Sequence, residues 1–115
     1  MTGEKEKTNV LGVCVGRTQN LIELIEYSKN SIVSKTVLDK PAGTITLFAF
    51  DEGQKLSEHT TPYDAVVQVL DGRANVTIGC KDVEALAGQI IIMSGNVPHA
   101  VFAKEKFKML LTMVR

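Results

Sequence analysis

Short apolar segments, broken by turn residues at a regular interval, are the feature of this chain that most restricts its fold. The breaks contain Gly, Pro, Asp or Asn and recur mostly every 7 to 10 residues, with one longer gap across residues 54–63. Val, Ile, Thr and Phe, which favour strands, are frequent between the breaks. This pattern predicts an all-β antiparallel sandwich or barrel. The predicted strands are residues 31–38, 44–50, 64–70, 73–79, 89–93, 99–103 and 107–114.

Two local patterns give more specific expectations. The pair Asp71–Gly72 is a strong hairpin signal, because a tight turn needs a positive φ that Gly adopts without steric cost. Residues 18–28 are the one helical candidate, since Thr18 or Asn20 can cap a helix whose apolar residues recur at helical spacing. The same run also fits a strand. Both interpretations of residues 18–28 therefore stay open.

Length and charge narrow the domain organisation and the partners. A chain of 115 residues is long enough for one domain and too short for two. We expect a polar, disordered tail over residues 1–9 and a β-domain over residues 10–115. Thirteen basic residues balance thirteen acidic ones without forming blocks, so we expect no nucleic-acid partner.

Features of export are missing from the sequence. The N-terminal residues lack the apolar run of a signal peptide, and no stretch approaches the roughly 20 apolar residues of a membrane span. Cys14 and Cys80 form neither a CxxC motif nor a zinc pattern. The chain is therefore expected to be cytoplasmic, away from membranes, with two free thiols.

Apolar residues stand at successive positions in several predicted strands, as in VVQVL, IIIM and MLLTMV. Such strands need cover on both faces, whereas a strand with one solvated face alternates between apolar and polar residues. One face can line a barrel interior. We expect the other to pack sheet to sheet against a second copy, giving a homodimer with closed two-fold symmetry.

The only two histidines of the chain, His59 and His99, stand at corresponding places in two Gly-led segments. From Gly53, five residues lead to His59, and Thr61, Ala65 and Gly72 follow at fixed intervals; from Gly88, the run passes Ser94 and Asn96 to His99. These spacings resemble the two sequence motifs of the cupin superfamily, over roughly residues 31–114. The resemblance implies a jelly-roll barrel, a double-stranded β-helix, of the small single-domain kind, with both histidines at one interior site.

Departures from the motifs affect the expected metal site. In metal-binding cupins the first motif supplies two His and one Glu, and the second supplies one His. Here Thr61 and Ala65 replace two of these ligands, so the resemblance carries over only His59 and His99. Zinc and non-haem iron normally take at least three protein ligands, which leaves open whether iron, manganese, zinc or nickel is bound.

We interpret the chain as a small cupin barrel that binds a small organic molecule, with a degenerate two-His site. The alternative is a metal-dependent enzyme, a dioxygenase or an isomerase, with a two-His metal centre. The sequence does not decide whether the protein is an enzyme, because one fold serves many activities. The expected ligand pocket is mostly apolar and consists of His59, Thr61, Ala65, Val67, His99 and Val101.

Overall fold

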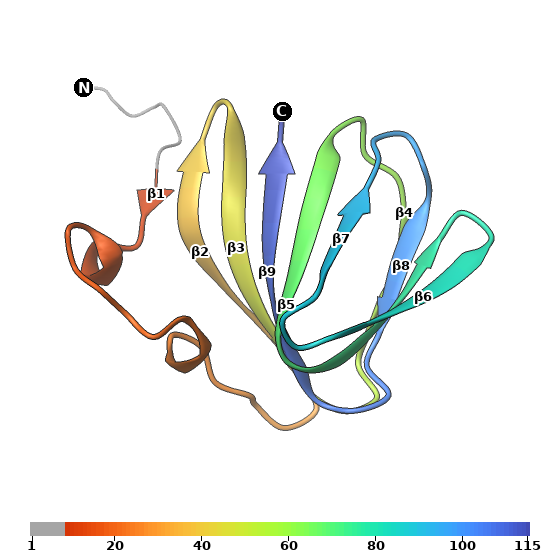
Figure 1. Cartoon of the computed structure of the whole chain (residues 1–115), viewed down its shortest axis with the longest axis horizontal. Helices are drawn as coiled ribbons and strands as arrows, with labels where there is room; N and C mark the ends of the chain where they lie inside the picture. The colour runs from red at the N-terminus through yellow and green to blue at the C-terminus, as the bar shows by residue number, and fades with distance from the viewer. Residues whose placement is uncertain (1–8) are drawn as a thin grey trace.

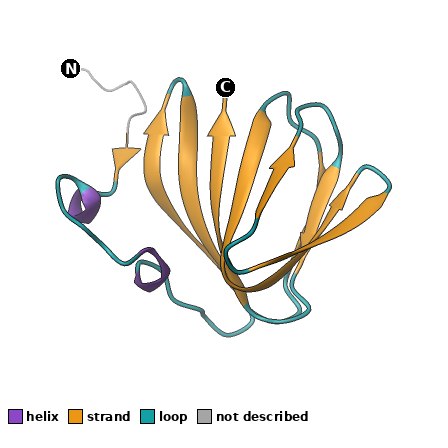
Figure 2. Cartoon of the chain, viewed as in Figure 1, coloured by secondary structure: helices purple, strands orange, loops and turns teal. Residues whose placement is uncertain are grey.

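Strands account for most of the computed structural model, which describes residues 9–115 (Figures 1 and 2). The predicted tail therefore lies outside the described residues except for Asn9, which pairs with Asp39. Two 3-10 turns, η1 (Gly12–Cys14) and η2 (Leu21–Glu23), precede the main strands. The strands are β1 (Asn9–Val10), β2 (Ile32–Lys40), β3 (Gly43–Phe50), β4 (Lys55–His59), β5 (Asp64–Ile78), β6 (Lys81–Leu86), β7 (Ile90–Met93), β8 (His99–Phe102) and β9 (Phe107–Val114).

All strand pairings are antiparallel and form two sheets that share β5. Sheet A has the order β1-β2-β3-β9-β5-β7 and uses the first part of β5. Sheet B has the order β4-β8-β5-β6 and uses the second part. Figure 1 shows β5 curving from one sheet into the other. This arrangement is the predicted jelly-roll barrel.

The bend in β5 replaces the hairpin predicted at Asp71–Gly72, and that prediction is wrong. β5 continues through both residues, and the pairing of β5 with β9 shifts register between Val69 and Asp71. Gly72 has φ +74°, as a turn would need, but here the positive φ serves a β-bulge that redirects one strand. The two predicted strands 64–70 and 73–79 are therefore a single strand. Two strands with several charged residues, β4 and β6, were not predicted.

The barrel interior is closed by apolar side chains of both sheets. Phe50 and Phe107 are fully buried and stack with ring centroids 4.5 Å apart and an interplanar angle of 15°. Around them lie side chains of β5, β8 and β9, among them Val67, Val101 and Met109. Large apolar residues at alternate positions of facing strands thus fill this core.

Residues 20–31 form neither of the predicted structures; they contain one 3-10 turn and otherwise extended or bent backbone. This segment, called the strap below, lies over the outer face of sheet A. Ile25 is 2% exposed and packs with Leu47 and Ala49 in a second apolar cluster. Leu24 and Ile25 of the apolar face predicted for a helix therefore pack on sheet A, whereas Leu21 is 37% exposed.

Besides a backbone hydrogen bond from the Asp51 amide to Ser31 O (3.1 Å), four hydrogen bonds that involve a side chain fasten the strap to the barrel. They run from Lys108 Nζ to Ile22 O (2.7 Å), from Lys35 Nζ to Leu24 O (2.6 Å), from Tyr27 Oη to Asp71 Oδ2 (2.6 Å) and from the Asn30 amide to Asp51 Oδ2 (2.7 Å). Lys108 and Lys106 also lie 5.1 and 5.4 Å from the Tyr27 ring centroid, which adds cation–π attraction.

Two side chains in these contacts have shifted pKa values. Burial, and then the hydrogen bond to the Asp71 carboxylate, raise the pKa of Tyr27. The amide of Asn30, followed by that of Glu52, lowers the pKa of Asp51. The contribution of Tyr27 to the free energy of unfolding is thus fully present below its ordinary pKa and is lost as the pH rises further. The contribution of Asp51 is instead lost as the pH falls into the acid range. The strap is therefore held most firmly between these extremes.

Replacing Tyr27 by phenylalanine is expected to lower the free energy of unfolding by about 1–2 kcal/mol, because the Asp71 carboxylate loses a hydrogen-bond donor. Urea denaturation measures this change. Tyr63→Phe, on an exposed loop, is the matched control and should cost less than about 0.5 kcal/mol. Equal losses in the two variants would contradict the role given to the Tyr27 hydroxyl.

Candidate functional site

The two histidines lie opposite each other on neighbouring strands. His99 begins β8 and is 7% exposed, and His59 ends β4, where it is exposed. Their rings are 4.4 Å apart between centroids and inclined at 68°. Two segments forty positions apart in the sequence thus meet at the histidines, but His59 is exposed, whereas the resemblance implied an interior position for both.

A β-bulge in β4 produces this alignment. Leu56 pairs with Val101, so in a regular ladder the partner of His99 would be Glu58. The register instead shifts after Leu56, and His59 becomes that partner. One extra residue thus brings an imidazole to the position that a carboxylate would otherwise occupy.

Backbone carbonyls orient both imidazole rings. His59 Nδ1 lies 2.9 Å from Ser57 O, and His99 Nδ1 lies 3.2 Å from Val97 O. A carbonyl oxygen only accepts hydrogen bonds, so each Nδ1 carries the proton and donates it. In the neutral ring, Nε2 then has a free lone pair. The pair can therefore accept two hydrogen bonds from a ligand or offer two nitrogen donors to a metal.

The loops that hold the histidines are joined directly. The Asn96 amide donates to Thr61 O at 2.7 Å, and the Gly95 amide donates to Asp64 Oδ1 at 2.8 Å. Asn96 has φ +67°, a conformation that Gly adopts easily and that Asn tolerates better than most residues. Asn96 therefore adopts this backbone conformation without a glycine, and Asp64 has a structural role.

The other predicted pocket residues have different surroundings. Ala65, Val67 and Val101 are at most 3% exposed and belong to the packed core. The Thr61 hydroxyl is 3.2 Å from Tyr63 O and 3.3 Å from the Tyr63 amide, so its hydrogen bonds lie within its own loop. The structure brings the two imidazoles together above an apolar core, with Thr61 in the adjoining loop.

The donor set does not fit a conventional metal centre. In the described part of the chain, no group of three or more His, Cys, Asp or Glu side chains is arranged to hold a metal ion. Two imidazoles remain, one fewer than the usual minimum for zinc or non-haem iron. Their carbonyl-anchored Nδ1 atoms nevertheless match the arrangement that orients metal-binding histidines.

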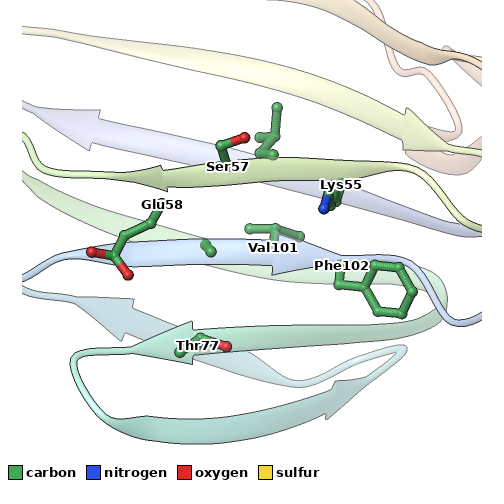
Figure 3. Close-up of a pocket in the computed structure, with 8 residues that line it drawn as sticks. Lys55, Ser57, Glu58, Thr77, Val101 and Phe102 are labelled. Atoms are coloured by element: carbon green, nitrogen blue, oxygen red, sulfur yellow. The ribbon is translucent and has the colours of Figure 1, made fainter.

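A separate groove of about 460 Å3 lies on sheet B (Figure 3). Leu56 and Val101 belong to the core or pack against it, so the alternate residues of β4 and β8 face outward. Figure 3 shows Lys55 and Glu58 toward opposite ends of this groove. No sequence pattern predicted this groove, because most of its residues alternate with core positions and form no motif. Its lining residues are Lys55, Leu56, Ser57, Glu58, Thr77, Ala100, Val101 and Phe102.

Fold and site together define a jelly-roll barrel with one histidine from each of two converging motifs. Residues 46–115 match the cupin domain family. The chain belongs to the cupin family. In the residues that the structure describes, no helix is long and apolar enough to cross a membrane.

Several solved structures are similar over most of the chain. A conserved Streptococcus pyogenes protein of unknown function is 33% identical, with a TM-score of 0.83 over 86% of this chain and 87% of its own. A cupin domain protein from Leptotrichia buccalis is 39% identical, with a TM-score of 0.82 over 84% of this chain but 47% of its own. A cupin superfamily protein from Desulfitobacterium hafniense is 26% identical, with a TM-score of 0.82, covering 85% and 90% of the two chains. A search of curated proteins found no match.

Proposed function

We propose that this cupin barrel binds a small organic molecule at the His59–His99 pair, through hydrogen bonds from the ligand to the two Nε2 atoms. The carbonyl anchoring of both rings supports this proposal most directly, because it fixes the protonated nitrogen of each ring. The matching ligand carries hydroxyl groups on a mainly apolar body, as phenols and small hydroxy acids do. The free thiols of Cys14 and Cys80 fit a cytoplasmic location.

The two histidines are assigned different parts in binding. His59 is exposed and can meet a ligand arriving from solvent. His99 is nearly buried, shares its strand with the core residue Val101 and pairs with Ile78 of β5. A ligand that contacts both rings would therefore place one end against apolar side chains and the other toward water, as small-molecule sites commonly require.

The His59→Ala variant is expected to lose at least about tenfold in affinity for any ligand of this site, since about 1.4 kcal/mol of hydrogen bonding is removed. Its stability should change little because His59 is exposed. A thermal-shift screen with small phenols and hydroxy acids measures ligand binding. Lys55→Ala, in the groove of Figure 3, is the control and should bind normally. Loss of binding only in the Lys55 variant would move the site to that groove.

The second candidate is a metal-dependent enzyme, a dioxygenase or an isomerase, in which His59 and His99 supply two ligands. The observation in its favour is the same carbonyl anchoring, which resembles that of metal-bound histidines. Metal analysis of untagged protein, after supplementation with iron, manganese, zinc or nickel, separates the candidates. Less than about a tenth of an equivalent would contradict a metal centre, given the tight binding expected of one. Near-stoichiometric metal that is lost in His59→Ala would favour it.

A further inference from the structure

We propose that the groove on the outer face of sheet B, called the outer groove below, binds a dipeptide with free termini. The carboxylate of the ligand lies at the end marked by Lys55 and Phe102 in Figure 3, and its ammonium group lies at the end marked by Glu58. This site is separate from the histidine pair, because His99 lies on the inner face of β8 in line with the core residue Val101.

One end of the outer groove is positively charged. Phe102 of β8 pairs with Lys55 of β4 and with Asn75 of β5, so these residues form one row across sheet B. A smaller cavity of about 200 Å3 shares Phe102 and Thr77 with the outer groove, and Lys104 also lines it. Two ammonium groups therefore lie near this end.

The acidic side chains nearest to this end are already paired. Arg73 lies 3.5 Å from both Glu84 and Glu105. Within the part of the chain that the structure describes, Lys55 and Lys104 form no ion pair. Both ammonium groups are therefore available to an anionic group of a ligand.

The other end of the outer groove is negatively charged. Ala100 of β8 pairs with Thr77 of β5, which in turn pairs with Asp82 of β6. The Thr77 hydroxyl donates to Asp82 Oδ1 at 2.8 Å and so holds this carboxylate beside the row. Glu58 belongs to the bulged part of β4 and lies at the same end as Thr77 in Figure 3. Two carboxylates therefore lie near this end, where they can receive a cationic group.

An apolar surface separates the two charged ends. Ala100 and Phe102 alternate with the core residue Val101, so they face outward, and Phe102 is 41% exposed. An apolar side chain of the ligand can cover this ring and remove its surface from water. Charges of opposite sign on either side of an apolar surface are complementary to a zwitterion with an apolar body.

The spacing of the two rows selects the length of the ligand. Ala100 and Phe102 are two residues apart on one strand, which places their rows about 6.7 Å apart. An extended dipeptide spans about 7 Å, whereas a single amino acid spans about half of that. Ser57 lies between Lys55 and Glu58 on β4 and also lines the outer groove, so its hydroxyl can bond to the peptide group.

Nuclear magnetic resonance titration of the full chain with leucyl-alanine tests the proposal. The wild type is expected to bind with a Kd of about 1 mM, as is usual for a ligand of this size. N-acetylated leucyl-alanine, C-amidated leucyl-alanine and free leucine should each bind about threefold more weakly, because each loses one exposed charge contact.

Two variants identify the groups that bind each terminus. Lys55→Gln should weaken binding of the free dipeptide about threefold, with a smaller effect on the C-amidated form, and Glu58→Gln should do the same with a smaller effect on the N-acetylated form. Lys81→Gln is the matched control and should bind like the wild type, since Lys81 is exposed on β6 and does not line the outer groove.

Several results would overturn the proposal. These are a Kd above about 10 mM for the wild type, equal affinity for the free dipeptide and its blocked forms or free leucine, and unchanged affinity in either Lys55→Gln or Glu58→Gln. An equal loss in Lys81→Gln would attribute binding to the general charge of the protein. Loss of dipeptide binding in His59→Ala, with both groove variants unaffected, would place the ligand at the histidine pair instead.

Discussion

Replacing Gly72 by alanine is expected to destabilise the protein by about 2–5 kcal/mol, which is a large part of the stability of a domain of this size. Two costs combine at this position. The φ of +74° disfavours any residue with a Cβ by about 1–2 kcal/mol. A methyl group would also overlap the carbonyl oxygen of Lys106 and approach the Cα of Phe107 to 3.1 Å. Relieving that overlap must move β5 away from β9, at about 1–3 kcal/mol more.

The Gly88→Ala variant measures the cost of the positive φ alone. Gly88 has a similar φ of +91°, but a methyl group there meets nothing within 4 Å. Its expected loss is only about 1–2 kcal/mol. Denaturant unfolding of both variants measures the difference. Equal losses would mean that the close approach between Gly72 and Lys106 has no energetic importance.

Truncating Phe107 to alanine is expected to cost about 3–5 kcal/mol, the usual range for a fully buried phenylalanine. The variant loses the stacking contact with Phe50 and leaves a cavity between sheet A and the bend of β5. Neighbouring residues cannot easily fill it, because Gly72 pairs with Phe107 and contributes no side chain.

Phe102→Ala provides the comparison for Phe107. Phe102 is an aromatic residue at the end of β8, but it is 41% exposed on the outside of sheet B. Its truncation should cost about 1 kcal/mol or less by thermal or denaturant unfolding. If Phe102→Ala were as destabilising as Phe107→Ala, the core assigned to the Phe50–Phe107 stack would be wrong.

Sequence patterns predicted most strands correctly and failed where one local sequence is compatible with two backbone structures. The segments rich in Val, Ile and Phe are strands, as predicted. Asp71–Gly72 supplied the positive φ of a turn, but only the contact with β9 determines that the chain bends instead of reversing. β4 was missed because its sequence, KLSEH, is mainly polar. A polar sequence is expected for an edge strand, and β8 is the only partner that the structure describes for β4.

The same limit applies to the candidate site. The two histidines lie together because the order of strands makes β4 and β8 neighbours, but motif spacing did not indicate that His59 is exposed. The alignment of their rings depends on a bulge after Leu56, and alternation along a strand cannot predict an extra residue. Hydrogen bonds from Nδ1 to Ser57 O and Val97 O likewise depend on backbone positions that side-chain patterns do not encode.

The position of β9 in sheet A has a consequence for protein synthesis. β9 follows every other described strand in the sequence, yet it lies between β3 and β5 and pairs with both along nearly its full length. Until the ribosome has released Phe107–Val114, β3 and β5 each present an unpaired edge. Such edges promote association between nascent chains. Sheet A can therefore be completed only after residues 107–114 have been synthesised and have left the ribosome, and until then both edges are open to other chains.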